Sequence, residues 1–72
     1  MMTNITDRLR AAYDAVIALP FDVDGEEWAT VTGEMVAAQE AAYRARCPDR
    51  VRWAMRDSFE RRLAEKNRAR AA

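Results

Sequence analysis

The sequence predicts an all-α fold, a small three-helix bundle, on three observations. Only two glycines and two prolines occur among the 72 residues, so few residues interrupt helices. Apolar side chains recur at spacings of three and four, the period of a helix with one buried face. The prolines divide the chain into three such segments. We predict helices over residues 3–19, 25–46 and 49–67, in one domain comprising residues 1–72.

The first predicted helix, residues 3–19, has a single apolar face. Thr3 or Asn4 can accept a hydrogen bond from the free N–H groups of the first turn, and Asp7 suits the positive end of the helix dipole. Pro20 ends the helix, because the residue before a proline avoids the helical conformation. The expected core residues of this helix are Ile5, Leu9, Ala12, Tyr13, Val16 and Ile17.

The second predicted helix, residues 25–46, has a clear start signal. Asp24 and Glu27 fit the spacing of a capping box, with aspartate in place of the usual serine or threonine. Val23 and Trp28 take the positions of a hydrophobic staple on either side of that cap. The connection after Pro20 therefore ends at Asp24.

This second helix is apolar around most of its circumference. Its seam consists of Trp28, Val31, Met35, Ala38 and Ala42, and one flank is widened by Val36, Tyr43 and Cys47. On the far side lie Gly33, Ala37 and Ala41, a strip where another helix backbone can approach closely. Since a helix that is apolar nearly all round is usually central, we expect this one to be the middle helix or to pack on both sides in a homodimer.

The third predicted helix, residues 49–67, follows Pro48, with Asp49 as the expected N-cap. Residues 67–72 contain no large apolar side chain that could dock them, so we expect a frayed tail. The expected apolar face consists of Val51, Ala54, Met55, Ser58, Phe59 and Leu63.

The formal net charge of zero conceals an asymmetry along the chain. Residues 1–43 contain two basic and eight acidic residues, whereas residues 44–72 contain ten basic and four acidic residues, which gives −6 and +6. This split either closes internally, by holding the third helix against the other two, or offers two oppositely charged interaction surfaces. The hydrophobic residues include 15 alanines, so the core is thin and association with a second copy is plausible.

Composition argues against catalysis and against a bound metal or cofactor. There is no histidine and only one serine, one lysine and one cysteine, so the usual acid–base and nucleophile arrangements are missing. One cysteine can form neither an internal disulfide nor a zinc ligand set. The segment from Asp22 to Glu27 resembles the opening of a calcium loop, but alignment on Gly25 puts Pro20 at the first ligand and Val31 at the bidentate glutamate. We predict a non-enzymatic protein without metal or cofactor.

Neither a signal-peptide pattern nor an apolar run long enough for a membrane span is present. We therefore expect a cytoplasmic protein without membrane contact.

Trp53 is the most informative single residue. On a helical wheel it lies nearly opposite Val51, Met55 and Phe59, among charges of both signs, as an interface anchor would. Alternatively, Pro48 and Trp53 form a staple around Asp49, and the ring covers the turn. The partner-binding candidates are Trp53, Arg52, Arg56, Asp57, Glu60, Asp22 and Asp24.

Arginine accounts for 11 of the 12 basic residues, which raises nucleic acid as an alternative partner. The helical wheel favours a different explanation, because these cations bracket the apolar face of the third helix, where their stems can cover its edges. The residues that would bind nucleic acid are Arg50, Arg52, Arg56, Arg61, Arg62, Arg68 and Arg70.

We therefore predict a small protein that docks on a larger protein or complex, with a DNA- or RNA-binding regulator as the alternative. By analogy with short proteins of phages and mobile elements, an inhibitor of host machinery of the anti-CRISPR type is one expected example.

Overall fold

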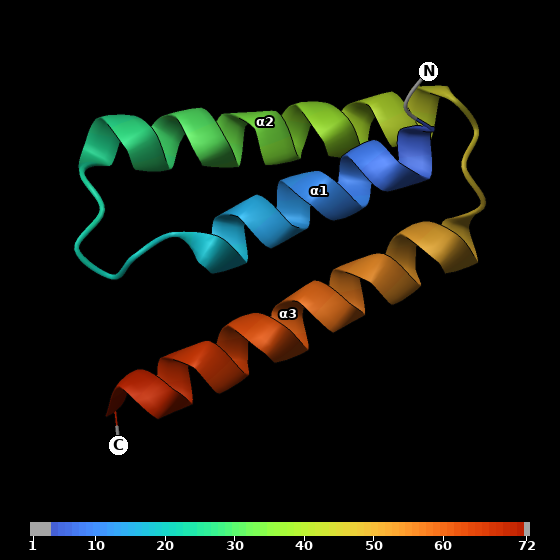
Figure 1. The fold of residues 1–72 in the computed structure, drawn as a ribbon. Coiled ribbons are helices and arrows are strands. Elements are labelled where there is room, and N and C mark those ends of the chain that lie inside the picture. Colours follow the sequence, from blue (N-terminus) through green and yellow to red (C-terminus); the bar gives the residue numbers. More distant parts are fainter. Residues whose placement is uncertain (1–3, 72) are drawn as a thin grey trace.

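A computed structural model describes residues 4–71 and confirms the three-helix bundle. The helices are α1 (Ile5–Ala18), α2 (Gly25–Arg44) and α3 (Asp49–Ala71), which run up, down and up (Figure 1). No strand occurs within residues 4–71. The long α3 makes the molecule elongated, with extents of 39 × 25 × 20 Å.

The start of α1 follows the sequence prediction. Asn4 is the N-cap, and its side-chain Oδ1 accepts a 2.7 Å hydrogen bond from the backbone N–H of Thr6. The alternative cap, Thr3, lies outside the described residues. The helix ends at Ala18, one residue before the predicted end, and Leu19 has the extended conformation expected before Pro20.

The start of α2 is also capped as predicted, and its end has a feature that the sequence did not announce. Asp24 Oδ1 accepts a 2.8 Å hydrogen bond from the N–H of Glu27, the aspartate half of the capping box. At the other end Arg46 adopts a left-handed conformation (φ 59°), so the helix ends at Arg44. The N–H of Cys47 then donates to the carbonyl of Ala42 over 3.0 Å, the long hydrogen bond of a Schellman motif.

The start of α3 corrects one prediction. Asp49 is not the N-cap, because it is already the first helical residue. The carbonyl of Pro48 accepts from the N–H groups of Val51 and Arg52, at 3.0 and 3.1 Å. Proline precedes the helix without cost here because the first turn does not need its missing N–H.

The end of α3 also differs from the prediction. The expected frayed tail over residues 67–72 is helical as far as Ala71, beyond which nothing is described. A contact that the sequence does not show holds this turn, because the guanidinium of Arg70 lies 4.6 Å from the ring centroid of Phe21.

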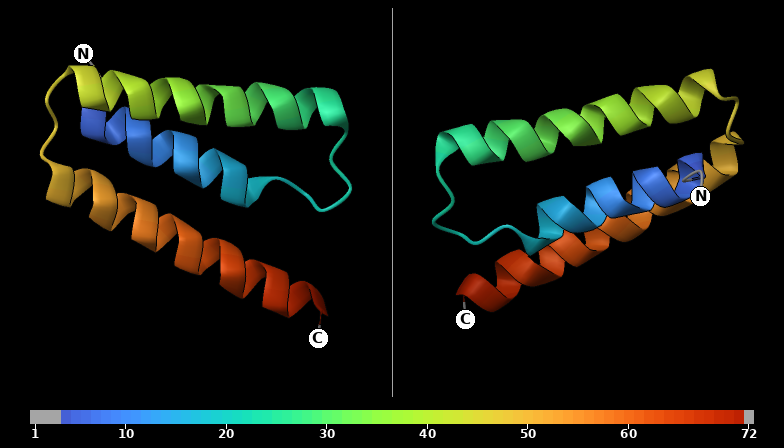
Figure 2. Two further views of the ribbon diagram at one scale, coloured as in Figure 1. Left: turned by 180° about the vertical axis from the view of Figure 1, so that it is seen from behind. Right: turned by 45° about the horizontal axis from the view of Figure 1, so that its top comes forward.

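The core lies along α1, which packs against both other helices, while α2 and α3 scarcely contact each other (Figure 2). The prediction that the second helix is the middle one is therefore wrong. Tyr13 of α1 stacks on Phe59 of α3, with ring centroids 4.7 Å apart. The buried residues lie mainly on α1: Leu9, Ala12, Tyr13, Val16, Leu19, Ala38, Ala42 and Phe59. The apolar flank of α2 is thus left uncovered instead of being packed from two sides.

Candidate docking groove between α2 and α3

The first of two openings between α2 and α3 lies near the α2–α3 connection. It has a volume of about 220 Å³ and is lined by Leu9, Tyr13, Gln39, Arg52, Trp53 and Arg56. The buried side chains of Leu9 and Tyr13 from α1 form its floor. Gln39 of α2 donates a 2.9 Å hydrogen bond to the hydroxyl of Tyr13, which satisfies the polar atom nearest the floor.

Trp53 forms part of this opening and is 64% exposed. It does not lie at the staple position, since α3 begins at Asp49 and Pro48 itself precedes the helix. The side chains that surround the α2–α3 turn also do not include Trp53; they are Tyr43, Arg44, Arg46, Cys47, Pro48, Asp49 and Arg52. Of the two interpretations of Trp53, the placement therefore favours an exposed anchor over a cover for the turn.

The second opening lies further along the same side, near the α1–α2 connection, and has a volume of about 250 Å³. Val16 and Leu19 form its floor, so the two openings follow one another along the buried face of α1. Its walls contain Trp28 from α2 and Phe21 and Val23 from the connection; α3 contributes Leu63, Lys66, Asn67 and Arg70. We call the two openings together the α2–α3 groove.

Five large hydrophobic side chains are exposed in the described part of the chain, and all five belong to this side of the molecule. Trp53, Phe21 and Trp28 line the openings themselves. Tyr43 lies under the guanidinium of Arg52, 5.3 Å from it, and Val36 lies on the same α2 flank between Trp28 and Tyr43. Contiguous apolar exposure of this kind marks interaction surfaces more often than scattered exposed residues do.

Arg52 is a structural residue of the α2–α3 corner. Its Nε donates to the carbonyl of Cys47 over 3.2 Å, and its other nitrogen pairs with Asp49. With the Tyr43 ring on one side, its side chain is only 21% exposed. Of the predicted partner-binding residues, Arg52 therefore has the least freedom to contact another molecule.

The other predicted partner-binding residues are spread over the surface. Arg56 forms a 3.1 Å ion pair with Glu60 along the groove wall. Asp57 is exposed, and its backbone carbonyl accepts from Arg61. Asp22 and Asp24 lie in the α1–α2 connection, at the opposite end of the groove from Trp53, and the Asp24 carboxylate is already engaged as the α2 cap (see above).

Lys66 is a residue whose role the sequence reasoning missed. Its Nζ donates to the backbone carbonyls of Ile17 and Leu19, so it caps the C-terminal end of α1 from the neighbouring helix. A cation at that end also compensates the helix dipole. One signal was available in the sequence, because the only lysine falls within the apolar face of its helix, where a cation needs a buried acceptor.

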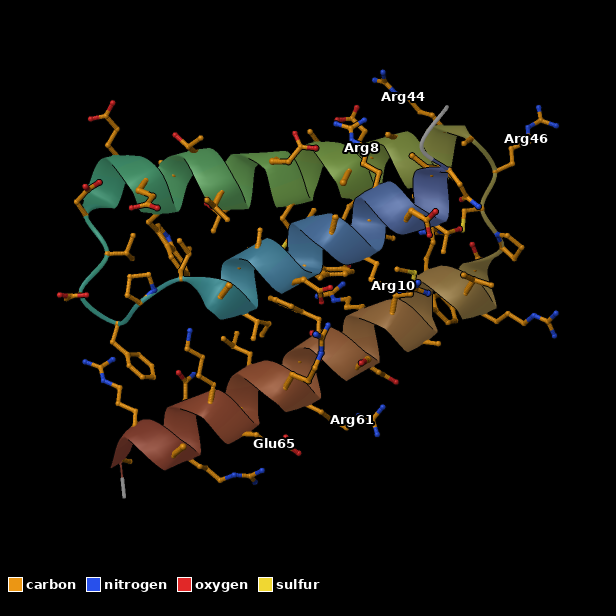
Figure 3. The ribbon with its side chains drawn as sticks, viewed as in Figure 1. Arg8, Arg10, Arg44, Arg46, Arg61 and Glu65 are labelled. Atoms are coloured by element: carbon orange, nitrogen blue, oxygen red, sulfur yellow. The ribbon has the colours of Figure 1, made fainter. Side chains whose placement is uncertain are left out.

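The seven arginines predicted for nucleic acid do not form one surface. Arg52, Arg56 and Arg62 are in ion pairs, and Arg70 stacks on Phe21. Arg50, Arg61 and Arg68 lie on the solvent side of α3, where acidic residues alternate with them; Arg61 and Glu65 project together in Figure 3. A track for phosphates would have gathered cations without interleaved carboxylates.

The strip of small residues on α2 faces away from the core. Gly33 and Ala37 are exposed, Ala41 is half-buried, and nothing lies within 4 Å of a Cβ placed on Gly33. Helix α1 therefore does not use the glycine for a close approach, and homodimer formation through this strip stays a prediction.

The opposite charges of the two parts of the chain are only partly matched inside the molecule. Among residues 4–71, Arg62 with Asp14, at 2.7 Å, is the ion pair that joins α3 to another helix. A second pair, Arg8 with Glu34 at 2.9 Å, joins α1 to α2. Most cations of α3 therefore pair within α3 or point to solvent.

These features define a three-helix bundle with an open apolar groove and no gathered acid–base or metal-ligating cluster in the described residues. Over the same part of the chain, no helix combines the length and apolar character that crossing a membrane requires. Comparison with known proteins finds no matching family model, no similar curated protein and no similar solved structure.

Proposed function

We propose that this protein is a non-enzymatic docking protein that binds another protein through the α2–α3 groove. The observation that carries the proposal is the gathering of the large exposed hydrophobic side chains along one groove (see above). Interfaces concentrate their binding energy in a few aromatic anchors beside a buried floor. Trp53 beside Leu9 and Tyr13 has that arrangement.

The experiment compares capture of partners by two matched variants. A tagged form of the protein is used to recover bound proteins from its native organism, alongside the Trp53→Ala and Arg61→Ala variants. Arg61 is the control, because it projects from α3 away from the groove (Figure 3). We expect a stoichiometric complex that Arg61→Ala retains and that Trp53→Ala weakens at least about tenfold.

Circular dichroism shows whether the variants stay folded. Because the Trp53 ring is mostly exposed, its loss should leave the thermal midpoint nearly unchanged. A folded Trp53→Ala variant that captures the same protein as strongly as the parent contradicts the proposal.

The nucleic-acid alternative makes a different prediction in the same assay series. A DNA-binding regulator is retained on heparin or DNA, with an affinity that falls steeply as salt is added. The docking proposal expects no such retention. That the partner belongs to host machinery, as for anti-CRISPR-type proteins, and that the protein is cytoplasmic stay predictions.

A further inference from the structure

The α2–α3 groove has the layout of a helix bundle that lacks one member. Both α2 and α3 pack on α1 but scarcely touch each other, so α1 is covered on two sides and open between them. Leu9, Tyr13, Val16 and Leu19 follow one another along the floor of this opening at spacings of three and four residues. This is the apolar stripe that another helix would pack against in a four-helix bundle.

The length of the groove suits a helix. Its α3 wall runs from Arg52 to Arg70, and 18 residues of helix span roughly 27 Å. Aromatic side chains stand at both ends, Trp53 at one and Phe21 and Trp28 at the other. An occupant with apolar residues at i, i+3, i+4 and i+7 would reach both ends.

The two walls differ in charge. The residues that line the two openings include the cations Arg52, Arg56, Lys66 and Arg70, all of them from α3, and no carboxylate. Arg52 and Arg56 have acidic neighbours on their own helix, whereas Arg70 stacks on Phe21 and is in no printed ion pair. The α2 wall presents only the neutral side chains Trp28 and Gln39. An occupant would therefore be acidic along one edge.

We propose that the α2–α3 groove binds an acidic amphipathic helix of a partner protein, which completes a four-helix bundle with its acidic edge along α3. The proposal rests on the proposed docking function and adds the chemistry of the partner. A second copy of this chain or a non-helical partner segment would be a different occupant, and the experiment distinguishes these cases.

The test uses two synthetic peptides of about 17 residues with leucine at the spacing of an apolar helix face; the remaining positions are glutamate in one peptide and lysine in the other. The emission of Trp53 and Trp28 reports binding, because both rings are part of the groove. We expect a blue shift and increased peptide helicity with the glutamate peptide, and at least about tenfold weaker binding of the lysine peptide.

Two charge-reversal variants locate the acidic edge. Arg70→Glu reverses a groove cation, and Arg68→Glu makes the same change on the exposed side of α3, two residues away. We expect the affinity for the glutamate peptide to fall about tenfold with Arg70→Glu and to change less than about twofold with Arg68→Glu. A second pair, Arg56→Gln and Arg61→Gln, repeats the comparison at the other end of the groove without introducing a negative charge.

Three outcomes overturn the proposal. The first is that neither peptide binds or that both bind equally. The second is that Arg68→Glu matters as much as Arg70→Glu. The third is that sedimentation shows a dimer of the free protein that Trp53→Ala dissociates, which makes a second copy the occupant. The docking function fails separately, when a folded Trp53→Ala variant keeps its captured partner; a Trp53-dependent partner that binds without an acidic helix overturns this inference alone.

Discussion

At the scale of single residues, the sequence was most informative about side chains that act on their own helix. Asn4 and Asp24 cap α1 and α2 because each needs only a backbone N–H two or three residues away. Lys66 and Arg70 contact groups more than 45 residues away in sequence, Lys66 on Ile17 and Leu19 and Arg70 on Phe21. Such contacts depend on which helices face each other, and periodicity within one helix does not specify that.

The left-handed Arg46 predicts a stabilising substitution. Its φ of 59° is strained for a residue with a Cβ, whereas glycine adopts it freely and is the usual residue at this position of a Schellman motif. Arg46→Gly should therefore raise the free energy of unfolding by about 1 kcal/mol. Chemical denaturation measures it, with Arg46→Ala as the control, since alanine removes the charge and keeps the strain. A loss of stability in Arg46→Gly would contradict the assigned conformation.

Lys66 predicts a destabilising one. Lys66→Met keeps the apolar stem and removes the cation from the carbonyls of Ile17 and Leu19, which should cost about 1–3 kcal/mol of stability. Arg61→Met is the matched control on the solvent side of the same helix and should change stability by less than about 0.5 kcal/mol. Equal midpoints for the two variants would mean that Lys66 does not cap α1.

At the scale of elements, apolar periodicity predicted the number and extents of the helices and which face of each is buried. The stripe on α1 supplies most of the core, as expected. The order of packing was not predictable, because α2 has the widest apolar surface yet part of it remains exposed, including Val36 and Tyr43. A wide apolar surface indicates a central helix only when every apolar flank is covered within the same chain.

The cap of α2 predicts how that helix responds to substitution at its start. Asp24→Ala removes the acceptor for the N–H of Glu27 and should lower stability by about 1 kcal/mol. Asp22→Ala removes the same charge two residues earlier, outside the helix, and should be close to neutral. Thermal unfolding of the two variants checks this. It also means that a binding defect of an Asp24 variant indicates a partner contact only when its helix content is unchanged.

Gly33 predicts a gain from a single methyl group. It lies within α2, and a Cβ at this position meets no atom within 4 Å, so Gly33→Ala should stabilise the protein by about 0.5–1 kcal/mol through helix propensity. Denaturation at several protein concentrations separates this effect from dimer formation. Destabilisation that grows with protein concentration would instead reveal a second copy packed against the strip.

At the scale of the whole molecule, the charge asymmetry and the thin core have one structural consequence in common. Few ion pairs join the helices, and α1 is covered on only two sides, so much of the bundle's apolar and basic surface stays available. The partner-binding residues expected from sequence were correct in type, with an exposed tryptophan among arginines. Their grouping was not predictable, because Phe21 and Trp28 join Trp53 along one groove only through the three-dimensional packing on α1.

The central claim is that the groove is open in the free protein and becomes covered when a partner docks. The most direct measurement is acrylamide quenching of Trp53 in a Trp28→Phe variant, alone and in complex with the captured partner. We predict ready quenching in the free protein, as the 64% exposure of the ring requires, and strong protection in the complex. A ring already shielded in the free protein, or one equally accessible in the complex, would contradict the claim.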